Sequence, residues 1–229
     1  MMRRWYPTVA LIALTLLALE SLSLRAEQAG GRVTGKVRLT VASSTPSSAT
    51  AYERRSVGPK PKPLPEIRNV IVFVSDLPAS KPAPMKASIS QKDEQFVPHV
   101  VAATTGSSVA FPNNDPFFHN VFSLSRGGSF NLGRYPSGAS RSETFRKPGI
   151  VKVFCEIHSQ MSAVIRVFDH PWFTIPVDDG SFALDDVPPG EHTLVAWHER
   201  IGERHEKVSI RPGATVQVIF TLPVLEPNP

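Results

Sequence analysis

Short apolar runs separated by glycine- and proline-rich turns recur along the chain after its first 30 residues. Some alternate apolar with polar residues, as in Arg32–Val41 (RVTGKVRLTV), and others are continuous, as in Val70–Val74 (VIVFV). Alternation predicts a half-buried strand, and a short continuous run is consistent with a buried one. Further strands are expected at 86–89, 97–102, 108–112, 119–123, 144–147, 150–154, 163–168, 173–177, 181–184, 192–197, 206–210 and 215–222.

The connecting segments support an all-β fold. The chain has 22 prolines and 14 glycines, and no amphipathic helix of any length is expected after the N-terminal segment. Residues 42–68 are rich in Ser, Pro and Lys and predict a long loop, while 78–84 (PASKPAP) resembles a linker. Many short strands between Gly/Pro turns indicate β-sandwiches.

The N-terminus has the pattern of a secretory signal peptide over residues 1–26. Arg3 and Arg4 precede a short apolar run, Val9–Leu19, and Ala26 provides the small residue before a cleavage point. The run is shorter than the roughly 20 residues that a membrane span needs. Leu24 fits the minus-three position poorly, so an uncleaved anchor remains an alternative. We expect a periplasmic or otherwise exported protein with no membrane span in the mature chain.

The charge balance argues against a nucleic-acid partner. Without residues 1–26 the chain keeps 22 basic and 19 acidic residues, a formal charge of +3 with no long run of one sign. Nucleic-acid binding requires a concentrated basic surface.

The single cysteine stands in the pattern C-x2-H-x2-M, formed by Cys155, His158 and Met161, between two expected strands. One cysteine excludes an internal disulfide. Upstream, FPNNDPFFHNVFS places His119 at the edge of another expected strand. A thiolate, two imidazoles and a thioether are the ligands of a type 1 copper site. The sequence therefore predicts one copper ion.

Two other interpretations of Cys155 fit the sequence less well. A buried structural cysteine would more commonly lie within an apolar strand than beside a histidine. Zinc favours Cys, His and carboxylate ligands, so Met161 argues for copper. Among the remaining histidines, His99 could sit near the site but is expected on a strand surface. A weak, exposed site of His192, His198 and His205 is not expected, because these residues lack close metal-ligand spacing.

The segments NNDPFFHNV and PGIVKVFCEIHSQMSAVIRV resemble the cupredoxins of the plastocyanin and amicyanin group. The chain also looks like the exported, cupredoxin-containing proteins labelled "methylamine utilization protein". The resemblance implies a Greek-key sandwich over 85–169. It makes His119, Cys155, His158 and Met161 the copper ligands, and it implies that Asn113 joins the two ligand loops.

The same resemblance makes His158 the solvent-facing ligand and His119 the more buried one. The neighbouring pair Phe117 and Phe118 then contributes either to a docking face or to the sandwich core. Large exposed apolar patches are uncommon without a function.

The C-terminal segment resembles a second family, the carboxypeptidase-regulatory-like or transthyretin-like β-sandwich. The matching features are the turn Asp179-Gly180, Phe182-x-Leu184 and the turn Val187–Gly190. The opening strands of that family resemble VTGKVRL and NVIVFV. We therefore expect the cupredoxin to be inserted into a discontinuous sandwich of 32–78 and 171–224.

These features favour a one-electron carrier that cycles between Cu(II) and Cu(I) and exchanges electrons with a partner redox protein. The alternative is storage or delivery of Cu(I) without redox turnover. An enzymatic role is not expected, because the H-x-H and H-C-H motifs of further copper centres are absent.

Overall fold

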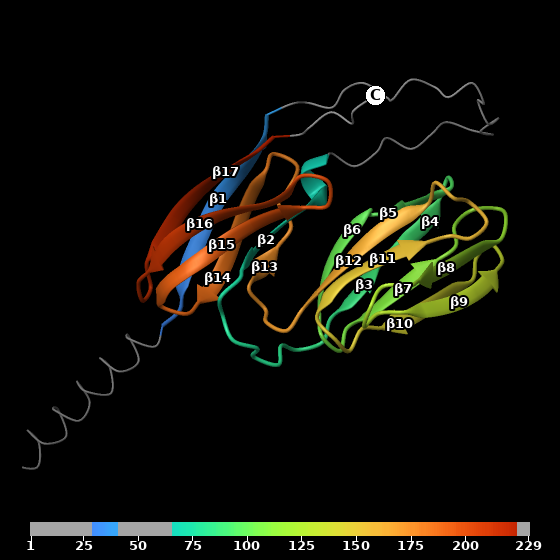
Figure 1. The fold of residues 1–229 in the computed structure, drawn as a ribbon, viewed down its shortest axis with the longest axis horizontal. Coiled ribbons are helices and arrows are strands. Elements are labelled where there is room, and N and C mark those ends of the chain that lie inside the picture. Colours follow the sequence, from blue (N-terminus) through green and yellow to red (C-terminus); the bar gives the residue numbers. More distant parts are fainter. Residues whose placement is uncertain (1–28, 41–65, 224–229) are drawn as a thin grey trace, which may run out of the picture.

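The computed structural model describes residues 29–40 and 66–223 (Figure 1), so the expected signal segment and most of the 42–68 loop lie outside the described residues. Within these ranges every regular element is a strand, except the short 3-10 helix η1 (Glu66–Asn69). The all-β class predicted from the sequence is confirmed. No helix in the described part is long and apolar enough to cross a membrane.

Two sheets form what we call the outer sandwich, which contains the first and last described strands. One sheet has the order β14 (Ser181–Val187), β1 (Gly31–Leu39), β17 (Thr215–Leu222). The other has the order β13 (Phe173–Thr174), β2 (Val70–Val74), β15 (Gly190–His198), β16 (Gly202–Ile210).

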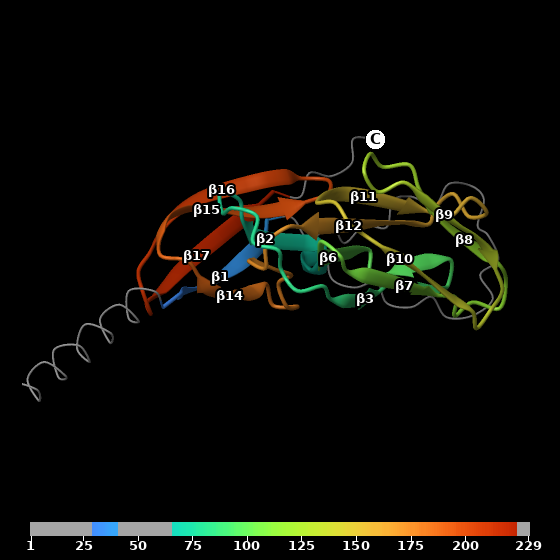
Figure 2. The ribbon, with the colours of Figure 1, turned by 90° about the horizontal axis from the view of Figure 1, so that it is seen from below.

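The strands between β2 and β13 form a second unit, the inner sandwich. Its larger sheet has the order β6 (Val100–Thr104), β12 (Ser162–Phe168), β11 (Gly149–Phe154), β8 (His119–Ser123), β9 (Phe130–Tyr135). Facing it are β10 (Ser140–Thr144), β7 (Ser108–Pro112), β3 (Lys86–Ser88) and a hairpin of β4 (Ser90–Lys92) and β5 (Gln95–Val97). The two sandwiches lie side by side along the molecule (Figure 2).

The chain enters and leaves the inner sandwich at one place. The amide of Ser80, on the way in, donates a hydrogen bond of 3.0 Å to the carbonyl of Asp169, on the way out. Strand β2 pairs with β13 and β15, both of the outer sandwich. Strand β1 runs parallel to β17 over eight residue pairs, so the two ends of the described chain lie in one sheet.

Some strands differ from the sequence prediction. The strand expected at 144–147 is instead β10, which ends at Thr144 and whose five residues are exposed or half-buried. The run 97–102 is divided between β5 and β6, and the run 173–177 yields only the two-residue β13. Strand β9 was not predicted. Its only fully buried residue is Tyr135, so it lacks a clear alternation of apolar and polar positions.

The continuous apolar runs are buried on both faces because the sandwiches pack against each other. In β2, Val70, Val72 and Val74 enter the core of the outer sandwich, whereas Ile71 and Phe73 face the other way. This second face meets residues of β6, β12 and β15 in a separate apolar cluster of Val100, Val164, Phe168, Val195 and Trp197. Successive side chains of a strand point to opposite faces, so each of these strands contributes to two cores.

Arg166 lies at the centre of this interface. Its guanidinium stands 4.2 Å from the ring centroid of Phe73 and 5.1 Å from that of Trp197, and it forms an ion pair of 3.3 Å with Glu203 of β16. A guanidinium stacked on aromatic rings keeps its charge while contacting apolar surface. Arg166 is therefore a charged residue of β12 that packs against the apolar face of the outer sandwich.

The helix η1 is attached to the end of β15 by a carboxylate, and this attachment should depend on pH. Hydrogen bonding from His198, opposed by burial and reinforced by Arg200, lowers the pKa of Glu66 from 4.5 to about 2. A carboxylate with a lowered folded-state pKa stabilises the fold above its unfolded pKa, and that stabilisation is lost as the pH falls from 4.5 towards 2.

We expect Glu66→Gln to lower the free energy of unfolding at neutral pH by about 1–2 kcal/mol, allowing for partial solvent screening. Urea unfolding over a pH series should show this deficit shrinking below pH 4.5. Glu206→Gln, which removes an exposed carboxylate of β16, is the control. A deficit that stays constant down to the lowest pH would contradict the assignment.

Candidate metal centre

The cysteine loop connects two adjacent antiparallel strands of the inner sandwich. Strand β11 pairs with β12 in register up to Phe154 opposite Ser162, and the loop between them holds Cys155, His158 and Met161. Two backbone hydrogen bonds close it: Cys155 N–H donates to the Met161 carbonyl at 3.4 Å, and Met161 N–H donates to the His158 carbonyl at 3.0 Å. The strand pairing and these two bonds bring three side chains with metal-ligand chemistry to one end of the sheet.

Three donor atoms converge at this end. Cys155 Sγ lies 3.9 Å from Nδ1 of His119 and 3.9 Å from Nδ1 of His158, and the two Nδ1 atoms are 3.1 Å apart. Within the described residues, no other group of three His, Cys, Asp or Glu side chains has its donor atoms gathered in this way. Atoms that bind one ion at about 2.0–2.3 Å stand about 3–4 Å from each other, so this triangle fits a single small metal ion.

Strand β8 supplies His119, and a carboxylate fixes the orientation of its ring. His119 is fully buried, and its Nε2 donates to Oδ2 of Asp115 at 2.7 Å. A carboxylate accepts hydrogen bonds only, so Nε2 carries the proton and Nδ1 is directed to the cysteine. Carboxylates behind metal-binding histidines commonly orient the ring and raise its basicity. Asp115 is therefore a candidate site residue that the sequence interpretation missed.

Asp115 is itself held by the turn between β4 and β5. The amides of Asp93 and Glu94, two residues with positive φ in that turn, donate to its carboxylate at 2.5 Å and 3.0 Å. Burial alone would raise the pKa of Asp115, but these amides and His119 lower it. The carboxylate therefore stays ionised beside the ring although it is only 4% exposed.

The environment of Cys155 favours the thiolate. Burial works to raise the pKa of its thiol, but the hydrogen bond with His119 and the backbone amides of Asn120, His158 and Ile157 lower the pKa to about 6. Burial likewise works to lower the pKa of His119, while Cys155 and Asp115 raise it overall. A thiolate is the form of cysteine that binds metal, so the site is prepared for an ion.

Met161 lies in the same region and is almost completely buried. It is 1% exposed and belongs, with Cys155, to the apolar core of the inner sandwich. Its backbone closes the cysteine loop, as described above. The structure thus gathers the donor atoms of His119, Cys155 and His158, and it places Met161 in the same apolar core cluster as Cys155.

Asn113 makes contacts that differ from those expected. Its side chain donates to the carbonyls of Phe117 at 2.8 Å and Tyr135 at 3.2 Å, and it accepts from the amide of Asp115 at 3.0 Å. None of these partners lies on the cysteine loop. Asn113 instead shapes the loop that carries Asp115 and His119 and attaches it to β9, so the expectation that it joins the two ligand loops is corrected.

An exposed apolar side chain lies against His158, and the neighbouring residues along the chain add others. Phe117 is 38% exposed and its ring lies against both histidines, with centroid distances of 5.2 Å to His119 and 5.4 Å to His158. Phe118 is 55% exposed and Ile157 is 38% exposed. Of the two expectations for Phe117 and Phe118, core filling is wrong, and these rings form part of an exposed apolar face.

Most of the remaining histidines each pair with a different carboxylate and do not gather at one site. His192 pairs with Asp76, His198 with Glu66, and His205 with Glu203. His99 is half-buried between the two sandwiches and pairs with Glu199. His170 is buried and stacks on Trp172.

Structural similarity is found with copper proteins at low sequence identity. A Cu-containing nitrite reductase from Thermus scotoductus is 26% identical over 43% of this chain and 25% of its own, with a TM-score of 0.36. A purple cupredoxin from Nitrosopumilus maritimus is 22% identical over 35% of this chain and 98% of its own, with a TM-score of 0.32. Amicyanin from Paracoccus versutus is 18% identical over 42% of this chain and 96% of its own, with a TM-score of 0.33.

The chain thus spans about a quarter of the length of the nitrite reductase chain. In all three comparisons, less than half of the present chain is matched. No model of a protein family and no curated protein sequence matches it.

The row of hydrogen bonds from Asp115 through His119 to Cys155 leads to a prediction for the metal-free protein. The ultraviolet absorbance of the thiolate should titrate with a midpoint near pH 6. In Asp115→Asn the ring of His119 loses its carboxylate partner, the pKa of His119 falls, and His119 stabilises the thiolate less. The midpoint for Cys155 should then rise by about one pH unit.

Glu156→Gln provides the matched control, because Glu156 follows the cysteine directly but pairs with Arg134. An equal rise in both variants would contradict the role of Asp115.

Proposed function

We propose that this chain is an exported cupredoxin-like protein that carries single electrons through one type 1 copper ion. The observation that carries the proposal is the triangle of one thiol and two imidazole Nδ1 atoms, in a sandwich whose core also contains the buried Met161. Thiolate, two imidazoles and a weak thioether form the donor set of blue copper sites. Copper, when bound, would supply a centre that alternates between Cu(II) and Cu(I).

The residues of the site would have distinct roles. Cys155, His119 and His158 would bind the ion, and Met161 would offer its thioether from the core. Asp115 would fix His119 through Nε2, as its hydrogen bond of 2.7 Å supports. A donor set that is already arranged by the fold changes little when the charge of the ion changes, which favours rapid electron transfer.

The exposed apolar face around His158 supports a redox partner protein. His158 is the half-buried member of the donor triangle, and Phe117 lies against its ring. A partner that covers Phe117, Phe118 and Ile157 would come close to the one imidazole near solvent. Exposed apolar groups of this kind are typical of interaction sites.

We assign no catalytic role to the site. A nucleophilic cysteine needs an accessible thiolate beside a base. Here the thiol is 4% exposed, in the core of the inner sandwich. The N-terminal pattern supports export to the periplasm, where the metal would be acquired.

Spectroscopy of the mature protein with added Cu(II) tests the proposal. We expect an intense visible band from thiolate-to-copper charge transfer and a narrow hyperfine splitting in the EPR spectrum, both lost in Cys155→Ser. Loss of the strongest ligand should also reduce copper affinity by at least about 10-fold.

A colourless protein that still binds Cu(I) tightly would favour the alternative, storage or delivery of copper. If neither ion binds, the copper proposal is wrong and Cys155 is a structural residue. Glu156→Ala, next to the cysteine, is the control that should keep the band.

We also propose that the copper-binding sandwich is a domain inserted into a transthyretin-like outer domain. Three observations support this division: the pairing of β2 with β13 and β15, the separate cores of the two sandwiches, and the Ser80–Asp169 contact that brings both connections together. Insertions are tolerated where the two ends of the insert are close.

A fragment of residues 85–169 should accordingly fold alone and give the copper spectrum of the whole chain. Its melting temperature should be lower, because Val100, Val164 and Phe168 lose their partners in the outer sandwich. Circular dichroism and the visible spectrum measure the two outcomes. A fragment that stays unfolded with and without copper would show that the two sandwiches form a single folding unit.

A further inference from the structure

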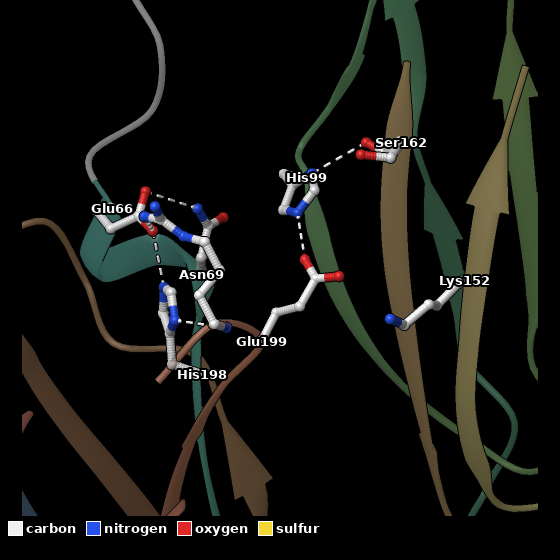
Figure 3. A pocket seen from close by; sticks show the side chains of 8 residues that line it. Glu66, Asn69, His99, Lys152, Ser162, His198 and Glu199 are labelled. Atoms are coloured by element: carbon white, nitrogen blue, oxygen red, sulfur yellow. Dashed lines mark hydrogen bonds and ion pairs between the residues drawn. The ribbon is translucent and has the colours of Figure 1, made fainter. Parts of the chain in front are cut away.

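Three consecutive residues at the end of β15 connect the outer sandwich to its neighbours. Trp197 lies against the guanidinium of Arg166, with 5.1 Å between the charge and the ring centroid. His198 Nε2 bonds to Glu66 at 2.8 Å, and Glu199 accepts a hydrogen bond from His99 Nε2 at 2.7 Å. Figure 3 shows the last two pairs in the cleft between the sandwiches. The position of Glu199 is therefore fixed by the two residues before it.

His99 is bonded at both ring nitrogens. Nδ1 lies 2.9 Å from the carbonyl oxygen of Ser162, and Nε2 lies 2.7 Å from the carboxylate of Glu199 (Figure 3). Both partners are acceptors, so both nitrogens must donate, and the ring carries two protons and a positive charge. The hydrogen bond that His99 donates to Glu199 raises the pKa of His99 against the effect of burial, which agrees with a charged ring.

The bond from His99 to Ser162 reaches the end of the cysteine loop. Ser162 is the residue after Met161, and its carbonyl is the one that His99 holds. The backbone carbonyl of His99 also accepts from the amide of Val164 at 2.8 Å. His99 thus forms hydrogen bonds with the residues before and after Ala163 at the start of β12. This is next to the place where the loop closes on Cys155.

We propose that Glu199 and His99 are positioning residues, through which the outer sandwich holds the Cys155–Met161 loop in its metal-binding shape. Neither side chain belongs to the donor triangle. Glu199 fixes the His99 ring, His99 fixes the Ser162 carbonyl, and that carbonyl sets where Met161 and the loop-closing hydrogen bonds lie. The proposal concerns the loop itself, and only its consequence for copper rests on the proposed function.

The interface offers a second carboxylate that serves as a matched control. Glu203, in β16, also pairs across the two sandwiches, but its partner Arg166 lies further along β12, with three residues between it and Ser162. The side chain of Glu199 is 27% exposed and that of Glu203 is 38% exposed. If Glu199 merely stabilised the interface, the two alanine variants would have the same effect on the loop.

Hydrogen exchange in the metal-free full chain tests the proposal directly. Loss of a hydrogen bond to a charged group costs enough to raise local opening about 10-fold. We expect the amides of Cys155 and Met161 to exchange about 10-fold faster in Glu199→Ala and at the wild-type rate in Glu203→Ala. His99→Leu, which removes both hydrogen bonds of the ring, should reproduce the effect of Glu199→Ala.

The proposal would be overturned by unchanged exchange of the loop amides in Glu199→Ala, and equally by the same acceleration in Glu203→Ala. The amide of Val218, in the outer core, reports general destabilisation. If it accelerates as much as the loop amides, Glu199 acts on stability alone and the positioning role is also refuted.

Copper binding provides the second readout. Glu199→Ala should bind Cu(II) with about 10-fold lower affinity and show a changed ratio of the visible bands, whereas Glu203→Ala should match the wild type. If the wild type itself binds no copper, the proposed function fails but the exchange result still decides the positioning role. If the wild type binds copper and the loop amides of Glu199→Ala are unaffected, only the positioning role fails.

Discussion

The structure depends on the packing of two sheets that each bury both of their faces. Strands β2 and β15 of the outer sandwich present one face to their own core and the other to β6 and β12 of the inner sandwich. Since side chains alternate across a strand, a single change of register in any of them would disturb two cores at once. This constraint fixes the inner sandwich relative to the outer one, and with it the position of β12, at whose start the cysteine loop closes.

The candidate metal centre combines apolar burial with a balanced set of charges. Cys155 and His119 are almost completely buried, yet their contact lowers the pKa of the thiol and raises the pKa of the imidazole, and Asp115 accepts a hydrogen bond from the far side of the ring. Buried charges are tolerated when they are paired and hydrogen-bonded. The backbone amides of the β4–β5 turn extend this pairing to Asp115, so the arrangement is supported from both sheets of the inner sandwich.

Sequence patterns identified strands with continuous or alternating apolar positions and the side chains with metal-ligand chemistry. The expected strands at 70–74, 108–112, 119–123 and 215–222 are confirmed. Strand β9 was not predicted, and β10 was predicted too late in the chain. Both lie at sheet edges, where few positions are buried and the sequence shows no alternation of apolar and polar residues. Asp115 stands four residues before His119 in a loop, and only the three-dimensional path of that loop shows which of its polar residues faces the ring.

The parallel pairing of β1 with β17 has a consequence for the order in which the chain folds. Thr40 and Leu222 contact each other across 182 residues, so the outer sandwich cannot close until nearly the whole chain is present. All the inner strands, in contrast, lie within residues 86–168. Long-range pairing is slow because the loop entropy must be lost first. During synthesis or translocation the inner sandwich would therefore be complete first, and the outer sandwich would form around it.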